Sequence, residues 1–598
     1  MYPVTEAYKQ QMEKVVRNYS HIKIVFGITD PDAPNSSTIT DNGHEVFNDS
    51  DSVDKGVAAA TPYATLEHNR MTLDGRSLLP PDDDFVYQGF VSSFISDENG
   101  VWDHPPKLTI EFNQVFQFAG LSFNFDTQNN DYPSELQLDF YKGGVQLASN
   151  IIYPDRADYE SSEHIPLMDK MVLTFLKSSR PYRRARISTL IYGLVSTLTE
   201  QDITECSYKT SADVVSSSLP NETFSFTIFD TEQKYDPENP KGVWEYLESR
   251  QPVQVSIGYS LDEGYIEWMP LCNTYSTGNV KVSRGGVVTE CTFETTSLLQ
   301  QLEKEYTEGV YTAEGATLYD LAEKVMTFCG YPDIIELDDS LRSIRTKAPL
   351  TVQPCNQILQ LIANAGMCVF VMRRSGIPAM IKLPEVSEDF HFDGTKIFDR
   401  PVTSKYPVLR DLKTTYSLYT VESEETDLIK NASVSQMAHT EIVYSYSNSV
   451  NQRVVAGSGV TVESSKFYVN RAVLVVSGTG TISLRGYLVT ETKVDVTKVV
   501  HEVGDTLEMS NSFITSEEHA QQYADWIARE MERRIEYTAE DRGYPELDVG
   551  DLIKFTTNFG NVVDTTVLTK EIKFNGAIRG SGVYLVKEAT EDVENTNI

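Results

Sequence analysis

The stretch from Thr515 to Gly576 constrains the fold most, because several local signals within it agree. Thr515 and Glu518 have the spacing of a capping box, in which each side chain satisfies a backbone N–H at the start of a helix. Apolar residues then recur at helical spacing as far as Ile535, where the period changes to two, as in a strand. Asn575-Gly576 lies between two alternating runs and favours a type I′ hairpin turn. The segment therefore predicts a helix over 516–535 that leads into an antiparallel β-barrel or sandwich.

Length and charge limit the remaining possibilities. A chain of 598 residues is too long for a single core, and about three to five domains are expected. Asp and Glu number 87 against 51 Lys and Arg, which gives a net charge of −36. Such a surface repels the phosphates of nucleic acids and anionic membranes, so we expect no tight nucleic-acid binding. No apolar run approaches the roughly 20 residues of a membrane span, and no secretory signal is visible.

The pattern of apolar and polar residues along the chain predicts a mainly β protein with a minor α/β part. Short alternating strands follow one another over 86–191 at the spacing of a β-sandwich, and alternating strands return over 194–302. Two amphipathic helices, the first capped by Thr317, and a hairpin predict a compact α/β unit over 303–395. The segment 29–60 is rich in Asp, Ser, Asn, Gly and Pro, and we interpret it as a long loop.

No catalytic or metal-binding motif stands out. HExxH, P-loop, GxSxG and CxxC patterns are absent, and the nine histidines never fall at two-ligand helical spacing. We therefore predict no catalytic residues, no metal site and no cofactor. The six cysteines are expected to be buried free thiols in a chain that folds in a reducing cytoplasm. Three alternatives stay open, namely a Cys–His site, a glycosidase carboxylate pair, and a structural calcium site at Asp126, Asn129 and Asp131.

Several short phrases carry a resemblance to a known family. Together they resemble the baseplate hub proteins of tailed bacteriophages, and most closely the tail-tip proteins of phages that infect Gram-positive bacteria. The C-terminal phrases are Trp526-Ile527, Arg533-Arg534-Ile535-Glu536-Tyr537, Arg542-Gly543, Pro545-Glu-Leu-Asp-Val-Gly-Asp-Leu-Ile553 and Phe574-Asn575-Gly576. Phrases near the N-terminus and in the first strand-rich region are similar to the same family: Tyr63-Ala-Thr-Leu-Glu67, Leu73-Asp-Gly75, Leu78-Leu-Pro80, Phe224-Ser-Phe-Thr-Ile-Phe229 and Trp244-Glu-Tyr-Leu247.

The resemblance implies a division into domains. Residues 1–87 plus 193–302 would form a first, discontinuous hub β-barrel, interrupted at 88–192 by an inserted discoidin-like, galactose-binding-like jelly roll. Residues 303–395 would be the small α/β domain. Residues 396–598 would be a second hub β-barrel, with a β-insertion at about 450–499 and the helix at 516–535.

The resemblance also implies a function. Similar hub proteins are homotrimers, in which two barrels per chain make a ring of pseudo-sixfold symmetry. The chain would be a non-enzymatic structural protein of the virion, assembled in the host cytoplasm. It would form the trimeric hub or tip of a tail baseplate, join the distal tail or tail tube protein to the tip, contact other baseplate or receptor-binding proteins, and guide DNA exit. The alternative is a carbohydrate-binding adhesin that attaches the tail tip to a host cell-surface glycan.

The loops of the jelly roll supply the candidate contact residues. An aromatic side chain stacks well on a sugar ring, and Tyr, Trp and Arg are also enriched at protein interfaces. The alternation along one strand predicts an exposed face of guanidinium groups, which suits the carboxylates of another acidic subunit. The hypothesis therefore favours a protein partner over a glycan. The candidate residues are Trp102, Tyr132, Arg180, Tyr182, Arg184 and Arg186.

Overall fold

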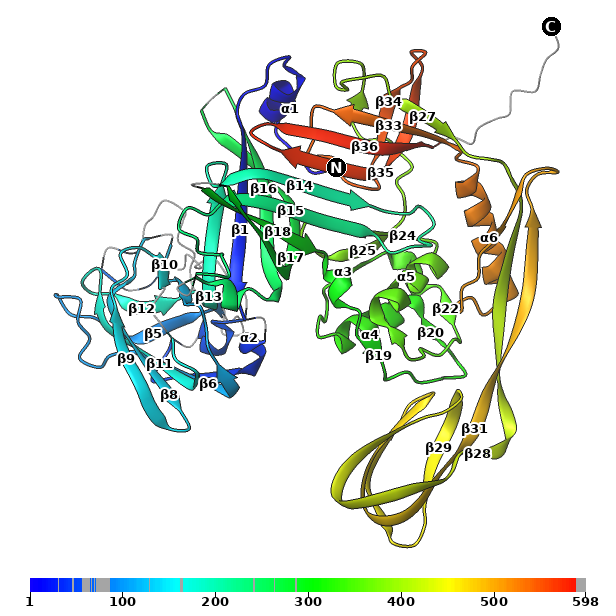
Figure 1. The fold of residues 1–598 in the computed structure, drawn as a ribbon, viewed down its shortest axis with the longest axis horizontal. Coiled ribbons are helices and arrows are strands. Elements are labelled where there is room, and N and C mark those ends of the chain that lie inside the picture. The colour runs from blue at the N-terminus through cyan, green and yellow to red at the C-terminus, as the bar shows by residue number, and fades with distance from the viewer. Residues whose placement is uncertain are drawn as a thin grey trace.

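Strands make up 53% of the chain and helices 12%, which confirms a mainly β fold with a minor helical part (Figure 1). The phrases at 73–75 and 78–80 lie outside the described residues, as does all of 63–67 except Thr65 and Glu67. The computed structural model describes residues 1–30, 32–45, 48–55, 65, 67–68, 70, 87–127, 129–161, 165–239, 242–262, 264–285 and 288–587.

The first β-lobe curls around an aromatic core. Its antiparallel strands follow the order β13-β1-β16-β17-β18-β15-β14. The rings of Phe26 on β1 and Phe293 on β18 lie 5.3 Å apart, although β16 and β17 separate these strands in the sheet. The sheet therefore bends back on itself, as in the predicted barrel. The elements are α1 (Glu6–Glu13), β1 (Ser20–Thr29), β13 (Thr189–Thr199), β14 (Ile203–Ser211), β15 (Asn221–Phe229), η2 (Trp244–Tyr246), β16 (Ser249–Ser260), β17 (Ile266–Gly285) and β18 (Val288–Thr296).

The second β-lobe is curled in the same way. The ring of Tyr537 on β33 stacks on that of Phe555 on β34 at 5.0 Å, although β36 and β35 lie between these strands in the sheet. A hairpin does form at Asn575-Gly576, but Phe574 pairs with Ile578, so its loop has three residues and is not the predicted type I′ turn. The elements are β26 (His391–Phe392), β27 (Val402–Lys405), β33 (Ile535–Asp541), β34 (Leu552–Thr556), β35 (Val562–Phe574) and β36 (Ile578–Val586).

One strand pairing joins the two lobes. β14 of the first lobe runs antiparallel to β35 of the second, in register from Cys206 opposite Phe574 to Ser211 opposite Thr569. Both lobes consequently belong to one 15-stranded sheet, and their buried apolar residues form one continuous cluster. Figure 1 shows the joined strands side by side across the top of the molecule.

The jelly roll begins earlier in the chain than predicted. β2 pairs with β6 in its main sheet, whose order is β2-β6-β11-β8-β9, so part of the segment interpreted as a loop of the first barrel belongs to the insertion. The Asp30 N–H donates to the Tyr192 carbonyl at 3.2 Å, so the insertion leaves and re-enters the first lobe at adjacent points. The elements are α2 (Ala33–Ser36), β2 (Ser37–Asp41), β3 (Asn48–Asp49), η1 (Ser50–Ser52), β4 (Tyr87–Gln88), β5 (Phe90–Ile95), β6 (Lys107–Phe116), β7 (Leu121–Asn124), β8 (Pro133–Lys142), β9 (Val145–Ile152), β10 (Asp158–Ser161), β11 (Met168–Ser178) and β12 (Arg184–Ile187).

Both predicted helices of the α/β unit are present. The Thr317 side chain accepts a hydrogen bond from the Asp320 N–H and caps α4, and α4 and α5 bury their apolar faces in one core. The elements are α3 (Leu298–Gln301), β19 (Glu305–Tyr306), β20 (Ala316–Thr317), α4 (Leu318–Phe328), β21 (Glu336–Leu337), η3 (Asp339–Arg342), β22 (Arg345–Thr346), β23 (Gln353–Pro354), α5 (Cys355–Ala365), β24 (Val369–Met372) and β25 (Pro378–Ile381).

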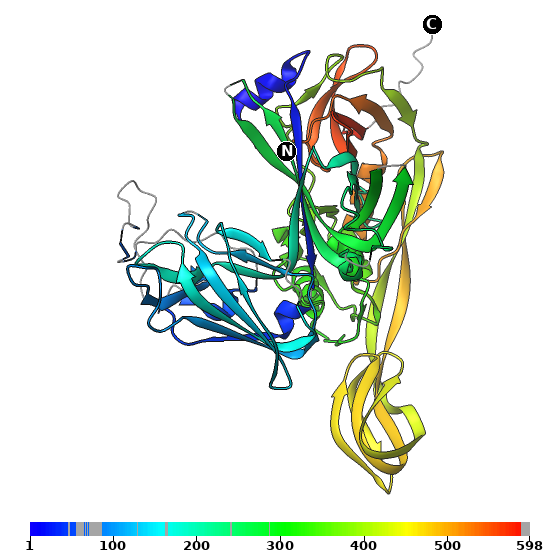
Figure 2. The ribbon, with the colours of Figure 1, turned by 60° about the vertical axis from the view of Figure 1, so that its left-hand side comes forward.

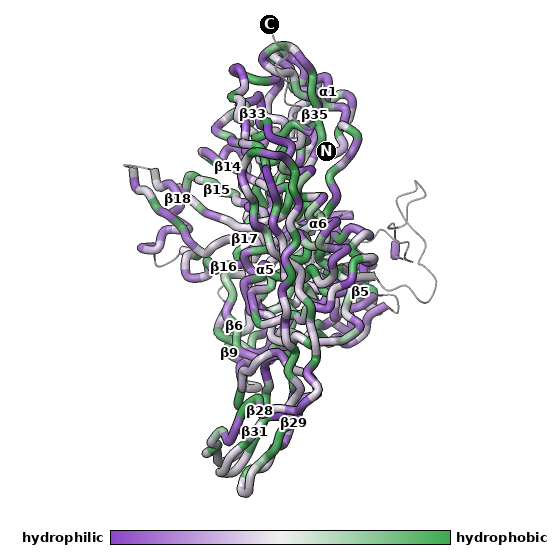
Figure 3. Tube along the Cα trace, turned by 90° about the vertical axis from the view of Figure 1, so that its right-hand side faces the viewer, coloured by the Kyte–Doolittle hydropathy of each residue, from purple (hydrophilic) through white to green (hydrophobic). Residues whose placement is uncertain are grey.

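A long two-stranded arm replaces the small β-insertion expected at about 450–499. β28 (Leu409–Ser445) and β31 (Arg471–Val499) pair along most of their lengths, and β29 (Ser449–Ala456) and β30 (Val460–Phe467) complete a small β-module at the far end. β32 (Asp505–Glu508) pairs with the near end of β28. Figures 2 and 3 show the arm projecting away from both lobes.

The helix predicted over 516–535 is α6 (Glu517–Met531), which is capped one residue later than expected and ends four residues earlier. The Ser516 hydroxyl accepts the hydrogen bond of the His519 N–H and is the N-cap. The Thr515 hydroxyl instead accepts from the Lys347 N–H at 3.1 Å, so this side chain connects the helix start to the α/β unit.

Candidate functional site

The titratable side chains of the described ranges form no group of three or more that would hold a metal ion. All six cysteines are free, as predicted, and five of them are buried. Of the helices that the structure describes, none has the length and apolar character needed to cross a membrane.

Of the predicted aromatic contact residues, Trp102 is packed inside the jelly roll and Tyr132 is partly buried against its core. Trp102 is only 3% exposed and lies edge-on to Phe175, with 6.3 Å between ring centres. Tyr132 is half-buried and packs against the same core. Tyr182 remains 41% exposed at the surface, next to the ring of His68. Trp102 is therefore unavailable for stacking on a ligand, which corrects its assignment as a loop-tip contact.

The expected face of exposed guanidinium groups is also wrong. Arg186 is 7% exposed, and its Nη1 donates to Glu67 Oε1 at 2.8 Å while its Nη2 binds the other carboxylate oxygen. The Arg184 N–H donates to the same Oε1 at 2.8 Å, and the Arg184 guanidinium pairs with Glu45. Burial alone would raise the pKa of Glu67, but hydrogen bonds from Arg186 and Arg184 hold it at about 2. Glu67 thus keeps these arginines inside the jelly roll.

Arginines also occupy the position considered for calcium. Asp131 lies 3.0 Å from Arg183 Nε, 3.3 Å from Arg180 Nε and 3.4 Å from Arg70 Nη1. Arg70 also pairs with the buried Asp126. Guanidinium groups therefore neutralise these carboxylates in place of the calcium ion. Of the four jelly-roll arginines at 180–186, Arg180 is the most exposed, with 49% of its side chain accessible.

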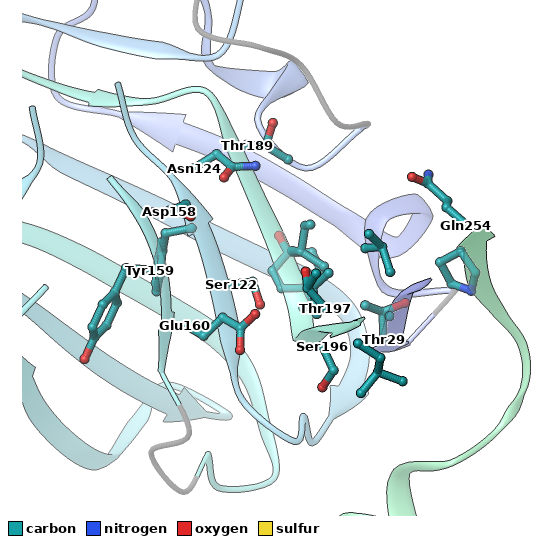
Figure 4. Close-up of a pocket in the computed structure, with 18 of the residues that line it drawn as sticks. Thr29, Ser122, Asn124, Asp158, Tyr159, Glu160, Thr189, Ser196, Thr197 and Gln254 are labelled. Carbon is teal, nitrogen blue, oxygen red and sulfur yellow. The ribbon is translucent and has the colours of Figure 1, made fainter. Parts of the chain in front are cut away.

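A different site is present where the jelly roll meets the first lobe. An open cleft of about 1380 Å³ lies between them (Figure 4). One wall is the outer face of the strands β10-β7-β13, on which Asp158, Asn124 and Thr189 stand in one cross-strand row. Glu160, Ser122 and Ile191 form the next row of the same face. The opposite face of these strands carries Phe123 and Leu190 and is buried in the jelly-roll core.

The floor of the cleft is the outer face of the first lobe. Thr197, Val25 and Gln254 lie side by side across β13, β1 and β16. Phe229, at the end of β15, also lines the cleft and is 46% exposed. Strand alternation predicts a polar outer face. No feature of the sequence predicts that two such faces lie opposite one another, because that depends on how the insertion packs against the first lobe.

Some polar and charged side chains of the cleft already have hydrogen-bond partners among the described residues, and others have none. Asp230 accepts hydrogen bonds from the Lys234 and Tyr235 N–H groups, and Asp202 accepts from the Thr199 N–H. Burial raises the pKa of Glu160 above its ordinary value, and the nearby Lys234 and Arg156 oppose that rise. In the described part of the chain, the side chains of Asn124, Glu160 and Gln254 make no hydrogen bond or ion pair.

Comparisons with known proteins give structural neighbours only. No family model and no curated protein matches the chain. The 43 kDa tail protein of prophage MuSo2 from Shewanella oneidensis matches 66% of this chain and 97% of its own, at 10% identity and a TM-score of 0.40. Prophage tail protein gp18 from Listeria monocytogenes matches 66% of this chain and 92% of its own, at 8% identity and a TM-score of 0.35.

A third neighbour is of another kind. The family 32 carbohydrate-binding module of NanJ from C. perfringens, solved in complex with galactose, matches 29% of this chain and 99% of its own, at 11% identity and a TM-score of 0.18. The neighbours thus include phage tail proteins and a carbohydrate-binding module. Similarity at this level assigns neither a family nor a function to the chain.

Proposed function

We propose that this chain is a structural protein of a phage-type tail, and that three copies form the hub or tip of its baseplate. One observation carries the proposal: a single chain contains two curled β-lobes that β14 and β35 join into one sheet. Three such chains around a threefold axis would place six like lobes in a ring, which suits a sixfold tail tube. The hub-like phrases of the sequence support the same reading.

The junction between the second lobe and the α/β unit is built as a rigid part, as a ring element requires. Lys570 on β35 is buried, and its Nζ donates to the Pro545 carbonyl at 2.8 Å and also to the Leu547 carbonyl. Arg374 reaches the same two carbonyls from the turn between β24 and β25, at 2.6 and 3.0 Å. Hydrogen bonds from the Arg374 guanidinium to two carbonyl oxygens fix orientation strongly. They connect the α/β unit with the second lobe.

The proposed role is mechanical and non-enzymatic. The hub would join the distal tail or tail tube protein to the tip and would contact other baseplate or receptor-binding proteins. A net charge of −36 fits a passage through which DNA slides without binding, because carboxylates repel phosphates. The protein would be assembled in the host cytoplasm and reside in the virion. A carbohydrate-binding role for the insertion is the second candidate, and the polar cleft favours it.

Antibody labelling of intact particles tests the assignment. An antibody against this chain should mark the tail tip of purified virions in negative-stain electron microscopy. Label along the tail shaft or on the head, or particles that lack the chain, would contradict the proposal.

A further inference from the structure

The cleft between the jelly roll and the first lobe has the features of a ligand site. Small-molecule and saccharide sites tend to lie in preformed hollows between domains, where a few polar groups converge beside an apolar surface. Here the hollow measures about 1380 Å³ and lies between two separately folded cores. It is also distinct from the jelly-roll loops, where the predicted contact residues are largely used within the fold.

The wall of the cleft offers a regular set of side-chain hydrogen-bonding groups. Asp158 and Asn124 stand on neighbouring strands, and so do Glu160 and Ser122 in the next row. Neighbouring strands are about 5 Å apart, a spacing comparable to one sugar ring. Figure 4 shows these side chains around the cleft, with Thr197 and Gln254 on the floor. Planar carboxylate and amide groups pair well with adjacent hydroxyls, because each presents two polar atoms to them.

Polar side chains of the cleft that make no hydrogen bond within the protein can bind a ligand. The side chains of Asn124 and Glu160 make no hydrogen bond to any other described residue, whereas the carboxylates of Asp202 and Asp230 accept hydrogen bonds from backbone N–H groups of their own turns. Phe229 adds an exposed aromatic ring to the lining. Aromatic faces next to polar groups provide an amphipathic surface of the kind that a sugar ring presents.

The chemistry of the lining selects among ligand classes. The cleft lining holds seven acidic side chains against four basic ones (Lys55, Arg156, Lys234 and Arg250), so its net negative charge disfavours phosphate-bearing and uronic acid polymers. The backbone groups of β7 pair on both sides, with β10 and β13, so the middle of this face offers side chains. A peptide could add as a strand only along the outer edge of β10, not on the face itself. We propose that the cleft binds a neutral oligosaccharide, with the Asn124 amide donating to and accepting from its hydroxyls, the Glu160 carboxylate accepting from them, and Phe229 packing on a ring.

Binding by the full-length chain tests this proposal. The protein is screened on an array of neutral and anionic glycans, and the strongest neutral binder is titrated by calorimetry. Asn124→Ala, Glu160→Ala and Phe229→Ala should each weaken that binding about tenfold or more. The matched control is Tyr182→Ala on the exposed jelly-roll loop, which should leave it unchanged. All three substituted side chains lie outside the core, and circular dichroism verifies that each variant is folded.

Three outcomes would overturn the inference. They are failure to bind any neutral glycan, preference for anionic glycans, and binding that Tyr182→Ala abolishes while Asn124→Ala leaves it intact. A peptide ligand in the cleft would appear as binding to a peptide library that Asn124→Ala weakens, without glycan binding, and would also refute it. None of these outcomes depends on the number of chains in the assembly, so the hub proposal is tested separately.

Discussion

The Tyr8 hydroxyl donates a hydrogen bond of 2.8 Å to Glu546 Oε2, and both side chains are buried. This contact connects α1, which precedes the first lobe, to the loop between β33 and β34 of the second lobe. Removing the hydroxyl leaves a buried acceptor without its donor, which costs about 1–3 kcal/mol. Tyr8→Phe should therefore lower the thermal midpoint of unfolding by several degrees in scanning calorimetry. Tyr19→Phe, at a side chain that is 72% exposed, should not; equal midpoints for the two variants would refute the role of the contact.

Glu222 makes the stability of the lobe junction depend on pH. Burial holds the pKa of its carboxyl at about 8, against 4.5 as the ordinary value, and the Tyr208 hydroxyl donates to it at 2.9 Å. Between about pH 4.5 and 8 the folded state binds this proton more tightly than the unfolded chain, so stability falls as pH rises through that window. Glu222→Gln keeps an acceptor for Tyr208 and removes the titration.

The expected result is a difference between two pH profiles. The free energy of unfolding of Glu222→Gln relative to the native chain should increase by on the order of 2–4 kcal/mol from pH 5 to pH 8. Asp541, whose pKa burial raises to about 6, is present in both proteins, so its effect cancels in the difference. Parallel denaturant-melt profiles for the two proteins would exclude this account of Glu222.

Glu67 should be indispensable to the jelly roll. Glu67→Ala leaves Arg186 buried without its carboxylate, which costs about 3–5 kcal/mol. Hydrogen exchange of the full chain should then show faster exchange of the β5 and β12 amides, with β35 unchanged. The control is Glu238→Ala, which removes one partner of an exposed ion pair with Arg284 and should alter neither region. Unchanged protection of β12 in Glu67→Ala would contradict the prediction.

The insertion should be removable. Thr29 pairs with Gly193 at its base, and the insertion has its own apolar core, so a short Gly/Ser bridge in place of residues 31–191 leaves the first lobe closed. The shortened chain should remain soluble, keep its β circular dichroism and unfold cooperatively. Aggregation of the shortened chain under conditions in which the full chain is soluble would show that the lobe needs the insertion to fold.

The sequence predicted best where local signals determine structure. Thr317 as a cap follows from capping chemistry, and the start of β33 at Ile535 follows from the change of apolar period at that residue. β2 escaped prediction because Ile39 is the only large apolar residue in a polar strand, and its pairing partner β6 lies about 70 residues away in the sequence. The arm was not predicted because Thr, Glu and Lys interrupt the apolar–polar alternation of its strands. No local signal indicates that two strands far longer than average pair with each other.

The candidate site shows the same limit. Alternation placed Arg184 and Arg186 on one strand, but whether they face solvent depends on Glu67, more than a hundred residues earlier. The cleft residues Asn124 and Glu160 look like ordinary outward-facing polar residues in the sequence. They become part of a cleft only because the insertion packs against the face formed by β1 and β16.

The mass of the purified chain in solution tests the central claim most directly. If two joined lobes per chain are one third of a ring, mass photometry at nanomolar to micromolar concentration should show a dominant species at three times the 67.2 kDa chain mass. Cryo-electron microscopy of that species should resolve six β-lobes around the threefold axis. A monomer or dimer at every concentration, together with a copy number per virion that is not a multiple of three, would contradict the account.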